Sequence, residues 1–197
     1  MIGAHLDSWD VGTGAHDDGA GCVIVMEAAR LLAGLPQPPR RTVRVVLYVD
    51  EESSQAGGRA YAEAHAAEIS RHAAALECDS GGFPPAGFSV DGNAVQVARV
   101  AELARALAPV GAAEVKAGGS GADIAAIVAL GVPGLGHRTE SGPYMDYHHS
   151  PADTFDKVDP GALARNVAAV AGIAWALAED ASPLRQLAPE APEDAGQ

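Results

Sequence analysis

Short apolar runs, of which residues 42–49 are rich in β-branched side chains, alternate along the chain with longer segments whose apolar residues recur at helical spacing. The short runs predict buried strands at residues 1–6, 42–49, 72–79 and 132–137. The amphipathic segments predict helices at residues 22–35, 57–69, 94–110, 124–131 and 161–180. Because strands alternating with helices are typical of α/β domains, we expect a mostly parallel mixed sheet sandwiched by helices.

Segments rich in Gly, Pro, Asp or Ser connect these elements. They predict loops at residues 7–21, 80–93, 116–123 and 138–160. The Pro- and Glu-rich segment 182–197 predicts a disordered tail, which leaves residues 1–181 as one domain. A buried strand that opens the sequence needs neighbours to shield it, so we expect a domain that lacks its N-terminal strands here.

Composition narrows the class of protein. The 197 residues carry a formal net charge of −13, which argues against nucleic acid and anionic membrane surfaces as partners. We expect no membrane-spanning segment and no leader peptide at Met1. Cys22 and Cys78 are expected to be buried thiols rather than a disulfide. The excess of carboxylates suits a site that a divalent cation partly neutralises.

Side chains able to bind metal stand where the predicted strands end. They are His5, Asp7, Asp17, Asp18, Glu51, Glu52, Asp79, His148 and His149. The carboxyl ends of parallel strands gather at one edge of a sheet, where a shared site would form. Residues two apart on a strand face the same way, so the carboxylate of Asp7 is expected to orient the ring of His5. Taken singly, each motif also has a structural explanation, such as an Asx turn, a helix start or an exposed loop.

Together the motifs resemble a known family. "GAHLDSWD", "GAHDDGAG", "DEES", "ECDSG" and "YHHSPADT" are similar, in this order, to the five motif blocks of the co-catalytic zinc exopeptidases. That family includes the bacterial leucyl aminopeptidases, and the blocks look most similar to its carboxypeptidase Q branch. The resemblance runs from residue 2 to about residue 180. It implies the α/β/α fold of these enzymes.

The resemblance also implies a role for each metal-competent residue. Asp17 would bridge two Zn²⁺ ions, one completed by His5 and Asp79 and the other by Glu52 and His149. Cobalt or manganese could replace zinc with such donors. Glu51 would be the general base that moves a proton from water to the leaving amine.

Further residues receive weaker assignments from the same resemblance. The Asp17–Asp18 peptide bond would be cis, and Asp153 and Thr154 would brace the loop of His149. Tyr144 or Tyr147 would donate to the oxyanion, and Asp123 is a candidate for substrate contact. The remaining assignments are a supporting or exposed position for His148, and no role for His16, His65, His72 and His137.

The implied activity is exopeptidase cleavage of dipeptides or short peptides, with no nucleic acid or membrane partner and a homodimer as an open alternative. Carboxypeptidase and aminopeptidase activities share such a site, so the motifs leave both open. A non-catalytic peptidase-like binding domain and the hydrolysis of a non-peptide amide are further alternatives. Relatives of this kind favour an extracellular or periplasmic location, although the sequence itself leaves the location unknown.

Overall fold

A computed structural model describes residues 1–140, 142 and 144–187 and shows one six-stranded sheet. Its strands are β1 (Ile2–His5), β2 (Val45–Tyr48), β3 (Ala75–Glu77), β4 (Pro85–Asp91), β5 (Val115–Ala117) and β6 (Gly134–Thr139). Their order is β2-β1-β3-β6-β4-β5. Only the β4–β6 pairing is antiparallel, so the expected mostly parallel mixed sheet is confirmed.

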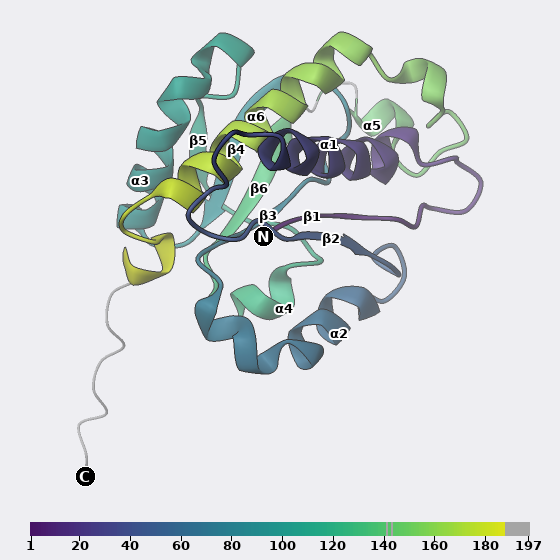
Figure 1. Ribbon diagram of the computed structural model, residues 1–197. Coiled ribbons are helices and arrows are strands. Elements are labelled where there is room, and N and C mark those ends of the chain that lie inside the picture. The colour runs from purple at the N-terminus through teal and green to yellow at the C-terminus, as the bar shows by residue number, and fades with distance from the viewer. Residues whose placement is uncertain (141, 143, 188–197) are drawn as a thin grey trace.

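Helices cover both faces of the sheet. They are α1 (Gly21–Ala33), α2 (Ala56–Ala64), α3 (Ala94–Ala104), α4 (Ala125–Val128), α5 (Tyr144–Tyr147) and α6 (Pro160–Glu179). Figure 1 shows α1, α3 and α6 on one face and α2 and α4 on the other. Shorter helical turns are η1 (Ala15–Ala20), η2 (Ala66–Arg71), η3 (Arg105–Val110), η4 (Phe155–Lys157) and η5 (Leu184–Leu187).

Two apolar clusters, one on each face, hold the layers together. The larger cluster packs α1 and α6 against the sheet through residues such as Ile24, Leu76 and Ile173. The smaller cluster joins Tyr48 of β2 to Ile127 of α4. Burial of such side chains contributes roughly 1.5–3 kcal/mol each. The central strands are therefore fixed from both sides, and the loops at their carboxyl ends start from rigid points.

The two strands at one end of the sheet depart from the sequence prediction. β4 lies in the segment expected to be a loop, and β5 begins just before the expected glycine loop. Gly87 in β4 has φ +119, and a side chain there would collide with the carbonyl of Glu114. The Pro and Gly residues that suggested a loop instead serve the bulge and the close strand contact.

Two further expectations are wrong in part. The tail was expected to begin at Ser182, but Leu184 in η5 is buried, and the side chain of Gln96 donates to its carbonyl. Residues 188–197 of the expected tail lie outside the described residues. Contrary to the expectation from sequence, α6 is long and apolar enough to span a membrane by length and composition alone. Half of its most apolar stretch is buried within this domain, mainly against α1 and the sheet.

Candidate metal centre

The candidate site lies at the carboxyl edge of the sheet, where three adjacent parallel strands end. His5 is the last residue of β1, Asp79 follows β3, and Glu51 and Glu52 follow β2. Asp17 comes from η1, immediately before α1. His149 comes from the segment after α5, more than 130 residues further along the chain. The fold thus brings together residues from five separate segments.

Asp17 stands between two groups of donor atoms. Its Oδ1 lies 3.3 Å from Nε2 of His5, which in turn lies 3.7 Å from Oδ1 of Asp79. Its Oδ2 lies 3.4 Å from Nε2 of His149, which lies 2.9 Å from Oε2 of Glu52. The two oxygens of one carboxylate therefore face different partners. All five sequence-predicted ligands are brought together.

The donor atoms have the spacing that a metal requires. Donors on one tetrahedral zinc ion are about 3.3 Å apart, since each lies about 2.0–2.1 Å from the metal. Within the described part of the chain, several buried donor atoms also have no hydrogen-bond partner: Nε2 of His5, Oδ2 of Asp17, Oε1 of Glu52 and Oδ1 of Asp79. Buried polar atoms are normally hydrogen-bonded, so unpartnered donor atoms gathered at one edge of the sheet fit a site for a metal ion. The residues present therefore fit a divalent cation.

The electrostatics of the site reflect its crowding by carboxylates. Burial lowers the pKa of His5, but its contacts with Asp17 and Asp79 outweigh burial and raise that pKa to about 12. Burial and the nearby Asp79 raise the pKa of the Glu51 carboxyl, and burial and Asp17 raise that of Glu52. Burial and the neighbouring acids therefore disfavour the ionised form of both glutamates, and a cation placed among them would relieve the repulsion.

Asp7 supports the site differently from the sequence prediction. Nδ1 of His5 donates to the backbone carbonyl of Asp7 at 3.0 Å, while the Asp7 carboxylate lies 3.6 Å from it. The carboxylate instead accepts the backbone N–H groups of Glu51 and Glu52, both at 3.2 Å. The carbonyl therefore sets the tautomer that leaves Nε2 of His5 free for a metal. The carboxylate holds the start of the turn that carries both glutamates.

The segment around Asp17 is braced from the other side of the site. The carboxylate of Asp153 accepts the backbone N–H groups of His16 and Asp17 at 2.7 and 3.0 Å. The hydroxyl of Thr13 donates to the Asp153 carbonyl at 2.8 Å. Asp153 thus ties the Asp17 turn to the segment that follows His149, as expected, whereas among the described residues the hydroxyl of Thr154 bonds to its chain neighbours Ala152 and Asp156. The Asp17–Asp18 peptide bond is cis, as the resemblance implied.

Asp123 does not have the exposure that substrate contact requires. It is 1% exposed, and neither carboxylate oxygen has a hydrogen-bond partner among the described residues. Burial raises the pKa of its carboxyl to about 7. Sequence analysis missed its neighbour Glu77, whose Oε2 accepts the N–H of Ile124 at 2.9 Å and whose pKa burial raises to about 8. The signal in the sequence was an acidic residue, Glu77, within the otherwise apolar run of β3.

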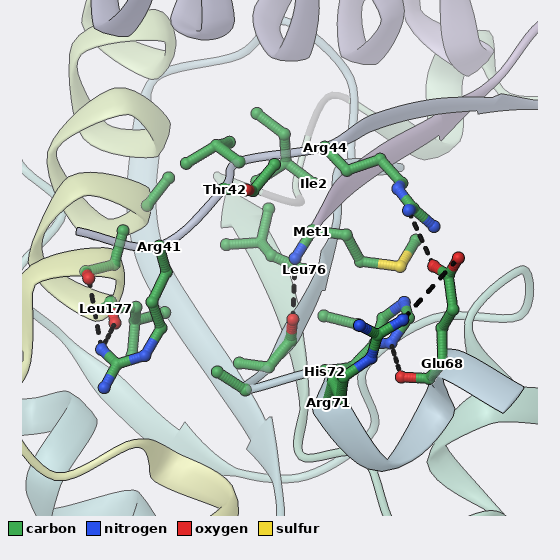
Figure 2. A pocket seen from close by; sticks show the side chains of 16 residues that line it. Met1, Ile2, Arg41, Thr42, Arg44, Glu68, Arg71, His72, Leu76 and Leu177 are labelled. Atoms are coloured by element: carbon green, nitrogen blue, oxygen red, sulfur yellow. Dashed lines mark hydrogen bonds and ion pairs between the residues drawn. The ribbon is translucent and has the colours of Figure 1, made fainter. Parts of the chain in front are cut away.

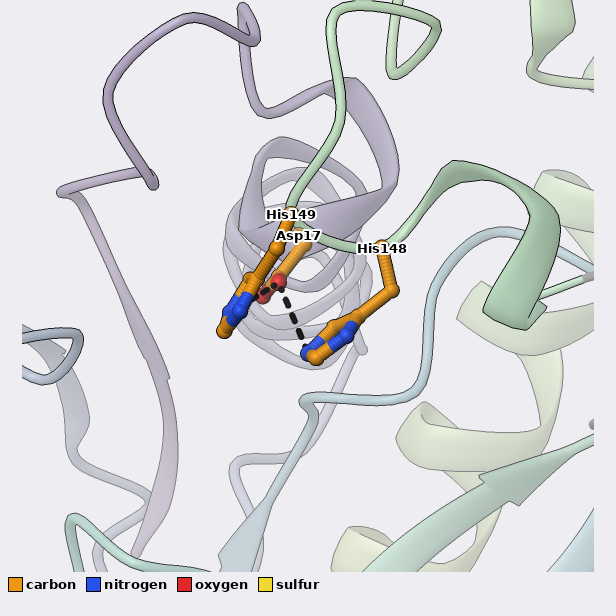
Figure 3. Close-up of side chains that lie close together, drawn as sticks. All are labelled: Asp17, His148 and His149. Atoms are coloured by element: carbon orange, nitrogen blue, oxygen red, sulfur yellow. Dashed lines mark ion pairs between the residues drawn. The ribbon is translucent and has the colours of Figure 1, made fainter.

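His148 lies closer to the centre than the sequence suggested. Its Nε2 is 3.5 Å from Oδ2 of Asp17, and its ring stacks on that of His149 with centroids 3.6 Å apart and planes inclined by 20°. Figure 3 shows both rings directed toward Asp17. The lone pair of an imidazole nitrogen lies in the ring plane, so two stacked rings cannot both point at one ion. His148 therefore supports His149 in this arrangement.

The surroundings of Tyr144 and Tyr147 differ. Burial, followed by the charge of Asp79, raises the pKa of Tyr144, which lies near the carboxylates. Tyr147 packs on Phe83 and on His16, with centroids 6.1 and 5.5 Å away. Tyr144 is thus the better placed of the two candidates for contact with the oxyanion.

The other histidines contact groups outside the centre: His16 with Gly82, His65 and His72 with Tyr61, and His137 with Asn166.

Comparison with known proteins agrees with this geometry. Residues 1–174 match the model of peptidase family M28. The chain belongs to this family.

This M28 chain is 38% identical to carboxypeptidase Q of Mus musculus over 179 residues, which cover 91% of the chain and 38% of that relative. The carboxypeptidase Q of Homo sapiens is 37% identical over 177 residues, covering 90% of the chain and 36% of the relative. The chain thus spans well under half the length of these relatives.

Solved structures share the M28 fold. The peptidase M28 precursor of Shewanella amazonensis SB2B superposes with a TM-score of 0.89 at 45% identity, covering 96% of this chain and 43% of that one. The zinc aminopeptidase BSAP of Bacillus subtilis gives a TM-score of 0.69 at 20% identity, with coverages of 86% and 44%. The second likeness concerns the fold alone.

Two pockets lie at different ends of the M28 sheet. A pocket of about 440 Å³ lies where β1 and β3 begin, and Figure 2 shows Arg41 and Arg44 at its walls. Their guanidinium groups already contact the end of α6 and Glu68, respectively. A smaller pocket of about 150 Å³ lies beside Asp79. Only the smaller pocket adjoins the candidate centre.

Proposed function

We propose that the chain is the catalytic domain of a zinc-dependent exopeptidase that hydrolyses dipeptides or short peptides in the manner of carboxypeptidase Q. The proposal rests on Asp17, whose two oxygens face separate groups of donors. Membership of family M28 supports a peptidase, and the similarity to carboxypeptidase Q supports the branch. Because the chain spans 38% of that relative, the activity of the whole protein is part of the proposal.

The donor set suggests how two ions would be held. His5, Asp17 and Asp79 would hold one ion, while Asp17, Glu52 and His149 would hold the other. Imidazole nitrogen and carboxylate oxygen suit zinc, and cobalt or manganese can replace it. Two divalent ions held by these residues would lower the pKa of water and polarise the carbonyl of the scissile bond.

Glu51 supplies the proton transfer. Its backbone N–H is held by the carboxylate of Asp7, so the side chain extends from a fixed turn. Burial and Asp79 raise the pKa of its carboxyl, which brings it nearer to the working pH of a general base. Glu51 accepts a proton from the attacking water, holds it while the carbon–nitrogen bond breaks, and transfers it to the leaving amine.

Replacement of Glu51 by Gln separates proton transfer from metal binding. Glu51→Gln should lower kcat by at least about 100-fold, because it removes the proton acceptor and no ligand. Zinc content should stay as in the parent protein. Glu63→Gln, a matched change at an exposed position, should leave both unchanged. Near-normal turnover by Glu51→Gln would refute the role of Glu51.

A substrate panel tests the direction of cleavage. N-blocked dipeptides, free dipeptides and aminoacyl-nitroanilides should be compared on the zinc-loaded protein. Cleavage of N-blocked dipeptides supports carboxypeptidase activity, because a blocked amine excludes recognition of a free N-terminus. Cleavage of aminoacyl-nitroanilides alone would instead assign the same site to an aminopeptidase. A protein that binds zinc but cleaves none of them would favour a binding domain.

A further inference from the structure

The imidazole of His149 lies in a stack of three aromatic rings. Trp9, in the loop after β1, lies almost parallel to it with ring centroids 4.5 Å apart and planes inclined by 12°. His148 lies parallel to it with centroids 3.6 Å apart. Two parallel rings this close to one imidazole would overlap if they shared a face. Trp9 and His148 therefore lie on opposite faces of His149.

His149 needs this support more than His5 does. The side chain of His5 is fully buried, and its Nδ1 donates to the carbonyl of Asp7. The side chain of His149 is 33% exposed, and within the described residues no hydrogen bond to its Nδ1 is found. Its backbone has φ +54, a conformation that residues other than glycine rarely adopt. Core packing and a hydrogen bond therefore fix one imidazole but not the other.

Trp9 lies outside the apolar core. Its side chain is 46% exposed, on a loop rich in Gly and Asp rather than in the apolar core. Single exposed apolar residues are ordinary on a protein surface, so the stack on His149, and not the exposure of Trp9, carries the argument. One face of the Trp9 indole covers the imidazole of His149, whose Nε2 lies 2.9 Å from Oε2 of Glu52.

We propose that Trp9 is a positioning residue for the ion bound by Glu52 and His149. Its indole and the ring of His148 hold the imidazole of His149 in one plane, replacing the hydrogen bond to Nδ1 that usually orients a ligating histidine. This inference rests on the proposed function, because it assumes a metal at that position. It concerns one of the two ions only, since His5 has its own support.

Calorimetric titration of the metal-free protein with Zn²⁺ tests the inference. In Trp9→Ala, affinity at one site should fall about 10-fold, as for other residues that orient a ligand, while the other site stays unchanged. Trp9→Phe should restore most of the loss, because a flat ring remains. Trp175→Ala is the matched control, since Trp175 is 47% exposed on α6, and it should bind as the parent does. Unchanged affinities in Trp9→Ala, or equal losses at both sites, would overturn the inference.

Fluorescence supplies a readout independent of the stability of Trp9→Ala. In Trp175→Phe, Trp9 is the single remaining tryptophan, because the chain has two. Binding of Co²⁺ next to the stacked ring should quench its emission. Emission that stays constant while calorimetry records bound Co²⁺ would refute the placement. A parent protein that binds no ion would refute the proposed function, whereas two bound ions with no effect of Trp9 refute only this inference.

Discussion

Replacement of Asp7 by Asn distinguishes between the two supporting roles that the residue combines. The variant keeps the backbone carbonyl that accepts from His5 and changes the carboxylate that accepts from Glu51 and Glu52. An Asn side chain offers one acceptor oxygen instead of two, so one of the two N–H groups loses its partner. A partly buried N–H without a partner costs about 1–3 kcal/mol.

That cost should appear in turnover rather than in metal binding. If most of it is expressed as misplacement of Glu51, kcat should fall about 5- to 100-fold, because about 1.4 kcal/mol corresponds to a factor of ten. Zinc affinity should change less than about threefold, since the orientation of His5 depends on the carbonyl. The assay combines steady-state kinetics on the best dipeptide substrate with calorimetric zinc binding.

Asp10→Asn is the matched control, because Asp10 is an exposed carboxylate in the same loop. It removes the same charge and should leave kcat and zinc affinity unchanged. A loss of zinc affinity of about 10-fold or more in Asp7→Asn would refute the reasoning, because such losses follow removal of a group that orients a ligand. Such a loss would indicate that the Asp7 carboxylate orients His5. An unchanged kcat would refute the positioning of Glu51.

Three further outcomes test the site and the fold. Asp17→Asn should weaken both zinc sites in calorimetric titration, because its oxygens face both groups of donors; loss of only one site would contradict the bridge. Removal of metal by a chelator should abolish peptide cleavage, and added Zn²⁺ should restore it; activity that survives metal removal would contradict the mechanism. Asp180→Asn should lower the free energy of unfolding at pH 7 by about 2 kcal/mol in urea denaturation, because Asp180 accepts two hydrogen bonds from Arg99 at 2.8 Å. Arg99 lowers the pKa of Asp180, so this contribution is present above the unfolded-state pKa and disappears as pH falls through the folded-state pKa; a difference between variant and parent that does not shrink as the pH is lowered would contradict it.

Repulsion among the acids explains why a metal suits this edge of the sheet. Asp50, Glu51 and Glu52 follow one another directly, and Asp17 and Asp79 approach from other segments. Burial raises the pKa of both glutamates, so folding places these acids where their charges are costly. The fold assembles this unfavourable cluster at the carboxyl ends of β1, β2 and β3. A cation would convert the repulsion into stabilisation.

The sequence by itself determined the class of fold and the members of the site. The apolar run of β1 and the helical spacing of α1 and α6 depend on neighbouring residues, so these elements were predicted closely. The ordered motif blocks identified the five ligand candidates, which the fold then brought together. The Pro and Gly residues of β4 predicted a loop, but this segment forms a strand that pairs with β6, and residue types within the segment do not report such a partner.

Only the tertiary structure decided which atoms act on which. The same residue, Asp7, offers a carbonyl to His5 and a carboxylate to Glu51, and no pattern of residue types distinguishes the two. The stack of Trp9 on His149 joins segments about 140 residues apart. Residue spacing reports which face of an element a side chain occupies, whereas distances between remote segments are set by how the helices and the sheet pack together.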